Sequence, residues 1–292
     1  MIRSYLRQIY RSAIPLFIGR KQFKLFLRAS LGDIDLRMLA LASQTDYFSG
    51  FVRAIPIRAP FGKSMLVVAP HQDDEVIGCG GALALQARSG SAASIVVLQD
   101  GAGEFEAVGV TRQALNERRN EESRQAAAVM GVPVPVFLNH PVLSADASQV
   151  AEMLDLLLRL KVDAVFVPFV LDGHPDHRTA NYILSAALRE IPSTVRIFCY
   201  EVWGFCIPNV VAVIDEVMEQ KIEALRCFHF ANSALDYTNS TVGLNMFNAR
   251  MLGAGQCRYA ERFFEIPREE YIELVGRVHA SENEAKGQRA MA

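Results

Sequence analysis

Residues 65–81 read MLVVAPHQDDEVIGCGG and hold the densest group of ionisable side chains in the chain. The apolar run at residues 65–69 is typical of a parallel strand that is buried on both faces. It ends at His71 and the three acids of residues 73–75, and open α/β sheets bind their ligands just beyond such strand ends. Adjacent buried carboxylates are costly unless a cation or hydrogen bonds compensate them, so this stretch predicts a metal site.

The rest of the chain repeats the same strand-then-helix order. Further strands are expected at residues 94–98, 134–138, 164–168, 195–200 and 210–214. Helices are expected at residues 74–87, 111–130, 147–160, from 177 to about 190, and at 216–230. This alternation predicts a Rossmann-like, doubly wound α/β fold with a mostly parallel sheet and helices on both faces. After about residue 232 we expect irregular chain with one helix at 268–278 and fraying beyond residue 280.

Composition and charge limit the class of protein. The 292 residues are 51% hydrophobic, and the five cysteines form no C-x-x-C pair, so a reducing, cytoplasmic compartment is expected. No apolar run approaches the roughly twenty residues of a membrane span, and no signal peptide is recognised. We expect a basic N-terminal extension and connector at residues 1–60 and one α/β domain at 61–292. Nothing in the sequence predicts an oligomeric state.

The first thirty residues carry seven basic side chains and no acid, interleaved with apolar residues at nearly helical spacing. Two interpretations stay open. The segment is either an amphipathic helix packed on the main domain or a peripheral anchor on an anionic membrane surface, on the inner face of the membrane. Basic charge is confined to this segment and no recognition motif follows, so nucleic acid is not an expected partner.

A second polar cluster, DGHPDH at residues 172–177, follows another apolar strand. His174 and His177 are three residues apart, which puts them on one side of a helix start. His71 and Asp74 have the same spacing. Two such pairs, from two strand ends, can meet around one cation.

The donor types in these pairs suit a catalytic metal. Two histidines and one carboxylate, with a position left for water, form a ligand set of catalytic zinc and also of non-haem iron. We therefore expect Zn2+, with Fe2+ as the alternative. A spare acid can accept a proton from water, and a spare histidine can stabilise an oxyanion or protonate a leaving amine. The pattern predicts metal-assisted hydrolysis.

These motifs resemble those of a known family. Residues 71–75 (HQDDE) followed by residues 78–81 (GCGG) resemble the H-x-D-D-E…G-x-G-G signature of the PIG-L/LmbE-like N-acetylglucosaminyl deacetylases. Arg119 and Glu122 fall in a segment that resembles the family's R-x-x-E-x-x-x-A helix, and residues 174–177 match its H-P-D-H. The resemblance covers about residues 64–264.

The resemblance also implies roles for individual residues. Zinc would be bound by three side chains: His71, Asp74 and His177. Asp73 would be the general base, and His174 would stabilise the oxyanion and assist the leaving amine, oriented by Asp176. The reaction would remove an N-acetyl group from a small-molecule or lipid-linked amino sugar. Gln72 stands where the family more often has proline and is expected to matter little.

Three further residues are candidates for substrate binding. Glu201 and Trp203 follow a predicted strand and resemble part of a Y-E-V-W pattern in one subgroup; an indole face suits the apolar side of a sugar. Arg119 either reaches the sugar or pairs with Glu122 on its own helix. The alternative function is an amidase for another acyl amide, such as a thiol-sugar conjugate. A non-catalytic binding protein of the same fold is disfavoured because every motif residue is present.

Overall fold

The computed structural model describes residues 54–103, 109–192, 194–204, 206–252 and 255–290. The basic segment at residues 1–30, with its two interpretations, lies outside these residues. In the part of the chain that is described, no helix combines the length and the apolar character that a membrane crossing requires.

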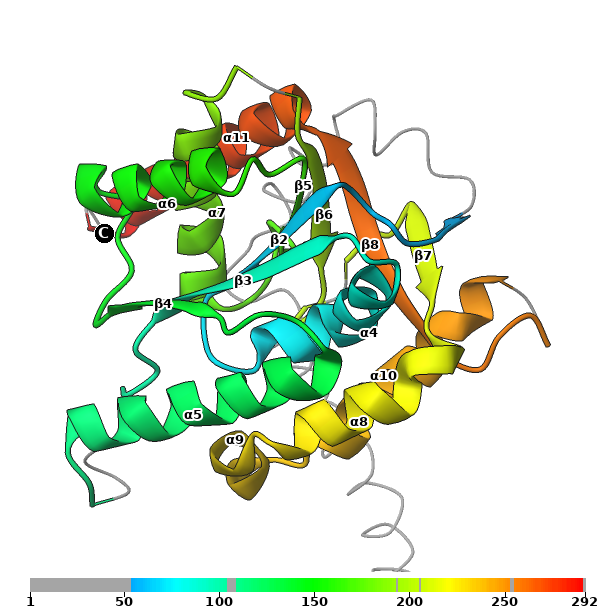
Figure 1. The fold of residues 1–292 in the computed structure, drawn as a ribbon. Helices are drawn as coiled ribbons and strands as arrows, with labels where there is room; N and C mark the ends of the chain where they lie inside the picture. Colours follow the sequence, from blue (N-terminus) through cyan, green and yellow to red (C-terminus); the bar gives the residue numbers. More distant parts are fainter. Residues whose placement is uncertain (1–53, 104–108, 193, 205, 253–254, 291–292) are drawn as a thin grey trace, which may run out of the picture.

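One eight-stranded sheet forms the centre of the molecule, in the order β1-β7-β8-β6-β5-β2-β3-β4 (Figure 1). Its strands are β1 (Ile55–Ile57), β2 (Ser64–Ala69), β3 (Ala92–Gln99), β4 (Val136–His140), β5 (Ala164–Pro168), β6 (Arg196–Tyr200), β7 (Val210–Val213) and β8 (Ala260–Pro267). All strand pairs are parallel except the two that β8 makes, with β6 and with β7. The carboxyl ends of the neighbouring strands β2 and β5 therefore lie at the same edge of the sheet.

Helices cover both faces of the sheet (Figure 1). One layer consists of α4 (Asp74–Arg88), α5 (Arg112–Met130), α8 (Met218–Arg226), α9 (His229–Ala234) and α10 (Tyr237–Ala249). The other consists of α6 (Ala147–Arg159), α7 (Pro175–Leu188) and α11 (Arg268–Ala290). Short 3-10 turns occur at Asp215–Val217 and Arg250–Leu252. The predicted fold class is confirmed.

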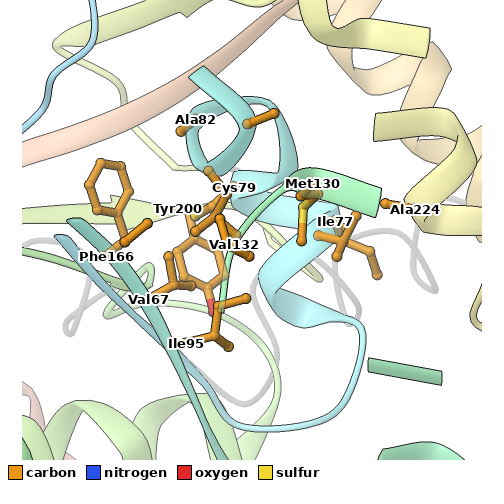
Figure 2. Close-up of a cluster of buried hydrophobic side chains, with 14 of the residues drawn as sticks. Val67, Ile77, Cys79, Ala82, Ile95, Met130, Val132, Phe166, Tyr200 and Ala224 are labelled. Atoms are coloured by element: carbon orange, nitrogen blue, oxygen red, sulfur yellow. The ribbon is translucent and has the colours of Figure 1, made fainter. Parts of the chain in front are cut away.

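The two helix layers explain why the sequence of β2 is apolar without alternation. Leu66 and Val68 pack into the core beneath α6, α7 and α11. Val67 faces the other core, beneath α4, together with Phe166 and Tyr200 (Figure 2). Successive side chains of a strand point to opposite faces, so a strand with a core on each side needs apolar residues at every position.

The structure corrects the prediction for the C-terminal third. The predicted helix at 216–230 is divided into the 3-10 turn, α8 and α9, while α11 continues to Ala290 instead of fraying. Both α10 and β8 were missed, as was β1, which lies in the predicted connector and pairs with β7. β8 was missed because the adjacent charged residues Glu261 and Arg262 are not typical of a buried strand. Both side chains are buried as ion pairs, Glu261 with Lys221 and Arg262 with Glu201.

An aromatic cluster tests the packing of the sheet centre. Phe166 is fully buried, stacked 4.5 Å from Phe198 and edge-on to Phe263 at 5.1 Å between ring centroids. We expect Phe166→Ala to lower the free energy of unfolding by about 3–5 kcal/mol because it leaves a cavity. Urea denaturation measures the change. Val134→Ala, at a position that is 65% exposed, should change stability by less than about 0.5 kcal/mol.

Candidate metal site at the carboxyl edge of the sheet

The two sequence clusters meet at one edge of the sheet. The first lies between β2 and α4, and the second lies between β5 and α7. Because β2 and β5 are adjacent and parallel, both loops emerge side by side. The sequence therefore brings the two pairs of ligand-type residues together through strand order, as the prediction required.

The donor atoms of the predicted ligands converge. Asp74 Oδ2 lies 3.2 Å from His71 Nδ1 and 3.2 Å from His177 Nε2. The imidazoles of His71, His174 and His177 also offer one nitrogen each within 4.8 Å of one another. His177 is fully buried, whereas the side chain of His174 is 37% exposed. His174 therefore lies on the solvent side of the cluster.

The buried residues fit a divalent cation. Neither ring nitrogen of His177 makes a hydrogen bond of acceptable geometry, although Nδ1 lies 3.2 Å from Asp172 Oδ1. A neutral imidazole that gives one N–H to a carboxylate and turns its other nitrogen toward a cation is the usual arrangement of a metal-bound histidine. A cation between His71, Asp74 and His177 would supply the missing partner.

The electrostatics of the cluster favour positive charge. Burial lowers the pKa of His177, but the Asp74 and Asp172 carboxylates outweigh it and raise that pKa to about 10. Burial lowers the pKa of His71 as well, yet hydrogen bonds to Asp176 and Asp74 raise it to about 8. Against its own burial, the pKa of Asp74 is held well below the usual range by His177 and His71. A bound cation would replace these protons.

Asp172 has no role predicted from the sequence, yet its carboxylate contacts the cluster. Its Oδ1 faces His177, and its Oδ2 accepts hydrogen bonds from the backbone N–H groups of Trp203 and Gly204 at 3.0 and 3.1 Å. Asp172 thus lies between the His177 imidazole and the loop after β6 and connects the two. Its place two residues before the H-P-D-H motif is the signal that could have found it, because ligating histidines are commonly oriented by a carboxylate.

Asp73 occupies a strained position at the start of α4. Its φ of 122° and ψ of −31° are rarely adopted by a residue with a side chain. Its N–H donates to Glu75 Oε2 at 2.9 Å, and Glu75 Oε1 accepts from Ser123 Oγ at 2.9 Å. Glu75 therefore supports the helix start. Burial raises the pKa of Asp73 to about 7, opposed by the Arg119 guanidinium, 3.5 Å away.

His174 and Asp176 are close to each other but differ from their predicted pairing. The backbone N–H of Asp176 donates to His174 Nδ1 at 3.2 Å, so the ring proton of a neutral His174 is on Nε2. Burial and the neighbouring His71 lower the pKa of His174 to about 4, which keeps it neutral at pH 7. Asp176 Oδ2 lies 3.0 Å from His71 Nε2 but 3.9 Å from His174 Nδ1. The carboxylate of Asp176 therefore orients His71 rather than His174.

Arg119 and Gln72 lie beside Asp73 and connect it to neighbouring loops. Arg119 donates to the carbonyl oxygens of Gly101 and Gln72 at 2.8 and 2.9 Å. It does not form the expected pair with Glu122, which lies 3.5 Å from Arg118 instead. Gln72 is buried and donates to Asp100 O and to Asn120 Oδ1 at 3.2 and 2.8 Å. The amide of Gln72 thus ties the loop after β3 to the site.

Glu201 and Trp203 have separate environments. Glu201 is buried, and its carboxylate accepts from Arg262 Nε at 2.8 Å and from the Cys206 N–H at 2.9 Å. It stabilises the loop after β6, and these contacts engage the carboxylate that was predicted to bind substrate, which corrects the prediction for this residue. Trp203 is 41% exposed, with its indole edge-on to Tyr237 at 5.9 Å between ring centroids. Its position next to Gly204 and Asp172 keeps it near the cluster.

Fold and cluster together define an α/β protein in which histidines and acids that could hold a metal ion meet at the carboxyl edge of the sheet. Residues 66–188 match the PIG-L family, described as GlcNAc-PI de-N-acetylase. This segment matches a PIG-L family domain, and the resemblance seen in the motifs is confirmed. The matched segment contains both clusters.

Relatives with known names or structures agree with this assignment. The diacetylchitobiose deacetylase of Thermococcus kodakarensis is 27% identical over 214 residues, which cover 66% of this chain and 77% of that protein. A conserved protein from Thermus thermophilus is 27% identical, with a TM-score of 0.59 over 68% of this chain and 93% of its own. The N,N'-diacetylchitobiose deacetylase of Pyrococcus horikoshii, 23% identical, shares the fold with a TM-score of 0.63 over 72% of this chain and 85% of its own.

The contact between Asp172 and His177 makes a prediction about metal affinity. We expect Asp172→Asn to weaken Zn2+ binding by roughly ten- to a hundredfold, because the carboxylate that orients the ligating imidazole is lost. Titration of the metal-free protein with Zn2+ measures the affinity. Asp155→Asn, at an exposed position on α6, is the control and should bind Zn2+ as the unchanged protein does. Equal affinities for both variants would refute the role of Asp172.

Proposed function

We propose that this chain is a metal-dependent N-deacetylase that removes the N-acetyl group from an amino sugar or glycoconjugate. The observation that carries the proposal is the convergence of His71, Asp74 and His177 beside an uncommitted acid, Asp73, and a neutral imidazole, His174. The family match and the names of the relatives support the amide bond and the sugar as the targets.

The proposed cofactor is Zn2+, held by His71, Asp74 and His177, with Fe2+ as the alternative. A divalent cation at this position would polarise an acyl oxygen and make a nearby water more acidic. With one carboxylate and two neutral histidines as ligands, the site would retain a net positive charge. That charge favours a developing oxyanion.

The protein residues then handle the protons. Asp73, as a carboxylate, accepts a proton from the attacking water and carries it on its own oxygen toward the leaving amine. The Nε2–H of His174 donates a hydrogen bond to the acyl oxygen as it gains negative charge, since Nδ1 is occupied by the backbone of Asp176. Asp176 keeps the ring of His71 in place, and Asp172 does the same for His177.

A substrate contact is proposed for one side chain of the rim. The exposed indole of Trp203 would stack on the apolar face of a pyranose. Arg119 acts mainly on Asp73 and on the loop after β3, and its guanidinium lies 5.3 Å from the centroid of the Phe230 ring. Lipid-linked amino sugars belong in the substrate panel, because one of the two interpretations of residues 1–30 is a peripheral anchor on an anionic membrane surface.

The roles of base and ligand are separable by mutation. We expect Asp73→Ala to keep stoichiometric zinc but to lose roughly a hundredfold or more in kcat, because general base catalysis is removed. His177→Ala should lose the metal. Acetate release from N-acetylated sugars, thiol-sugar conjugates and lipid-linked sugars, with metal analysis of each preparation, tests both. Full activity of Asp73→Ala would eliminate it as the base.

The acid limb of the pH profile depends on the ionisation of Asp73. The base acts when deprotonated, so activity falls as pH drops below its pKa. The Arg119 guanidinium lowers that pKa, so Arg119→Leu should move the acid limb of kcat/KM to higher pH, by roughly one unit or more. Arg118→Leu, which removes a neighbouring exposed arginine, is the matched control. Superimposable profiles of the two variants would contradict the link between Arg119 and Asp73.

A further inference from the structure

A buried ion pair lies against helix α4, the helix that begins at the site residue Asp74. Lys221 Nζ, from α8, is 2.6 Å from Glu261 Oε1, from β8. The two side chains are 0% and 1% exposed. Charges at such depth are costly to desolvate and are retained only with further polar partners.

Those partners are backbone groups in the middle of α4. Glu261 accepts from the N–H of Gly81 at 2.7 Å and from the N–H of Ala82 at 2.8 Å. Lys221 donates to the carbonyl oxygen of Ile77 at 2.9 Å. In an ordinary helix the Gly81 N–H and the Ile77 carbonyl form one hydrogen bond with each other. The ion pair therefore binds both the donor and the acceptor of one backbone hydrogen bond of the helix.

The G-x-G-G segment makes room for this arrangement. A Cβ on Gly81 would lie 3.0 Å from Glu261 Oε1 and 2.5 Å from Ile214 Cγ2. A Cβ on Gly80 would lie 3.1 Å from Lys221 Cγ. The glycines thus expose the helix backbone to the two side chains, which explains part of the motif without reference to the metal.

Ile77 is directly connected to the site through its backbone. The N–H groups of Val76 and Ile77 both donate to the carbonyl oxygen of Asp73, at 3.0 and 2.9 Å. Lys221 thus binds the carbonyl oxygen of Ile77, and the N–H of Ile77 binds the carbonyl oxygen of Asp73. Glu75 and Ser123 hold this turn from the other side.

We propose that Lys221 and Glu261 are positioning residues that fix the first turn of α4, and with it Asp73 and Asp74, in the geometry needed for metal binding and proton transfer. The inference rests on the proposed function for its catalytic part. Stability alone is a weak reason to retain such a pair, since well-packed apolar residues of similar volume often serve as well or better. Precise placement is a stronger reason, because a base displaced by about 1 Å can lose roughly a hundredfold in rate.

The test compares Lys221→Met, Glu261→Gln and the double variant with Gln86→Leu. Gln86 is a matched control because it is fully buried near the other end of α4 and hydrogen-bonds the Phe61 N–H and the Gly62 carbonyl. Three quantities are measured: Zn2+ affinity of the metal-free protein, amide hydrogen exchange of peptides covering residues 73–82, and kcat per folded molecule.

For Lys221→Met we expect a roughly ten- to hundredfold loss of Zn2+ affinity, faster exchange at residues 73–82 and at least a tenfold loss of kcat, with KM little changed. Gln86→Leu should lose stability without these effects. The double variant leaves no unpaired buried charge and should therefore be more stable than Lys221→Met. Its Zn2+ affinity should stay low, because the Ile77 carbonyl still lacks its donor.

Two outcomes would overturn the proposal. The first is a Lys221→Met protein whose Zn2+ affinity and exchange match those of Gln86→Leu. The second is a double variant whose Zn2+ affinity recovers together with its stability, which would make the pair a stabilising element only. If the unchanged protein releases no acetate from any substrate, the proposed function fails, yet Zn2+ affinity and exchange still decide on the positioning role.

Discussion

The structure of the site depends on one electrostatic constraint, the need of the Asp74 carboxylate for positive charge. Asp74 is buried between two imidazoles, and a second carboxylate, Asp172, lies behind His177. Acids at such depth ionise only where a compensating charge is available. Protons on the histidines meet that need in the metal-free protein, and a divalent cation meets it in the proposed enzyme. The groups next to Asp74 are thus suited to either source of positive charge, protons or a cation.

Two helix starts present the reactive groups, and each is held by interactions outside the motifs. α4 begins at Asp74 in a turn that is held by Glu75, which Ser123 supports in turn, and by the ion pair of Lys221. α7 begins at Pro175, with His174 as its N-cap. Strand order places these two starts side by side, and secondary contacts set the orientation of the side chains. A fold with this strand order can therefore carry different chemistry if those contacts change.

The sequence predicted the parallel sheet and the convergence of its two clusters because both depend on local patterns. The apolar run of β2 and the spacing of His174 and His177 are visible in the chain itself. Contacts between distant segments were not predictable in this way. Glu261 looks like a surface residue until Lys221, forty positions earlier, is placed beside it. Asp176 was assigned to its neighbour His174, whereas the fold turns it toward His71.

The position of β8 has a consequence for the order in which the chain can fold. β6 and β7 are consecutive strands, yet they do not pair, because β8 is inserted between them. Until residues 260–267 pair, the edges of β6 and β7 that face them are open, and such edges are prone to aggregation. Glu261 lies on the same strand and accepts hydrogen bonds from the backbone of α4. The strand that closes the sheet therefore also completes the hydrogen bonds on α4, so β8 couples closure of the sheet to the support of the site.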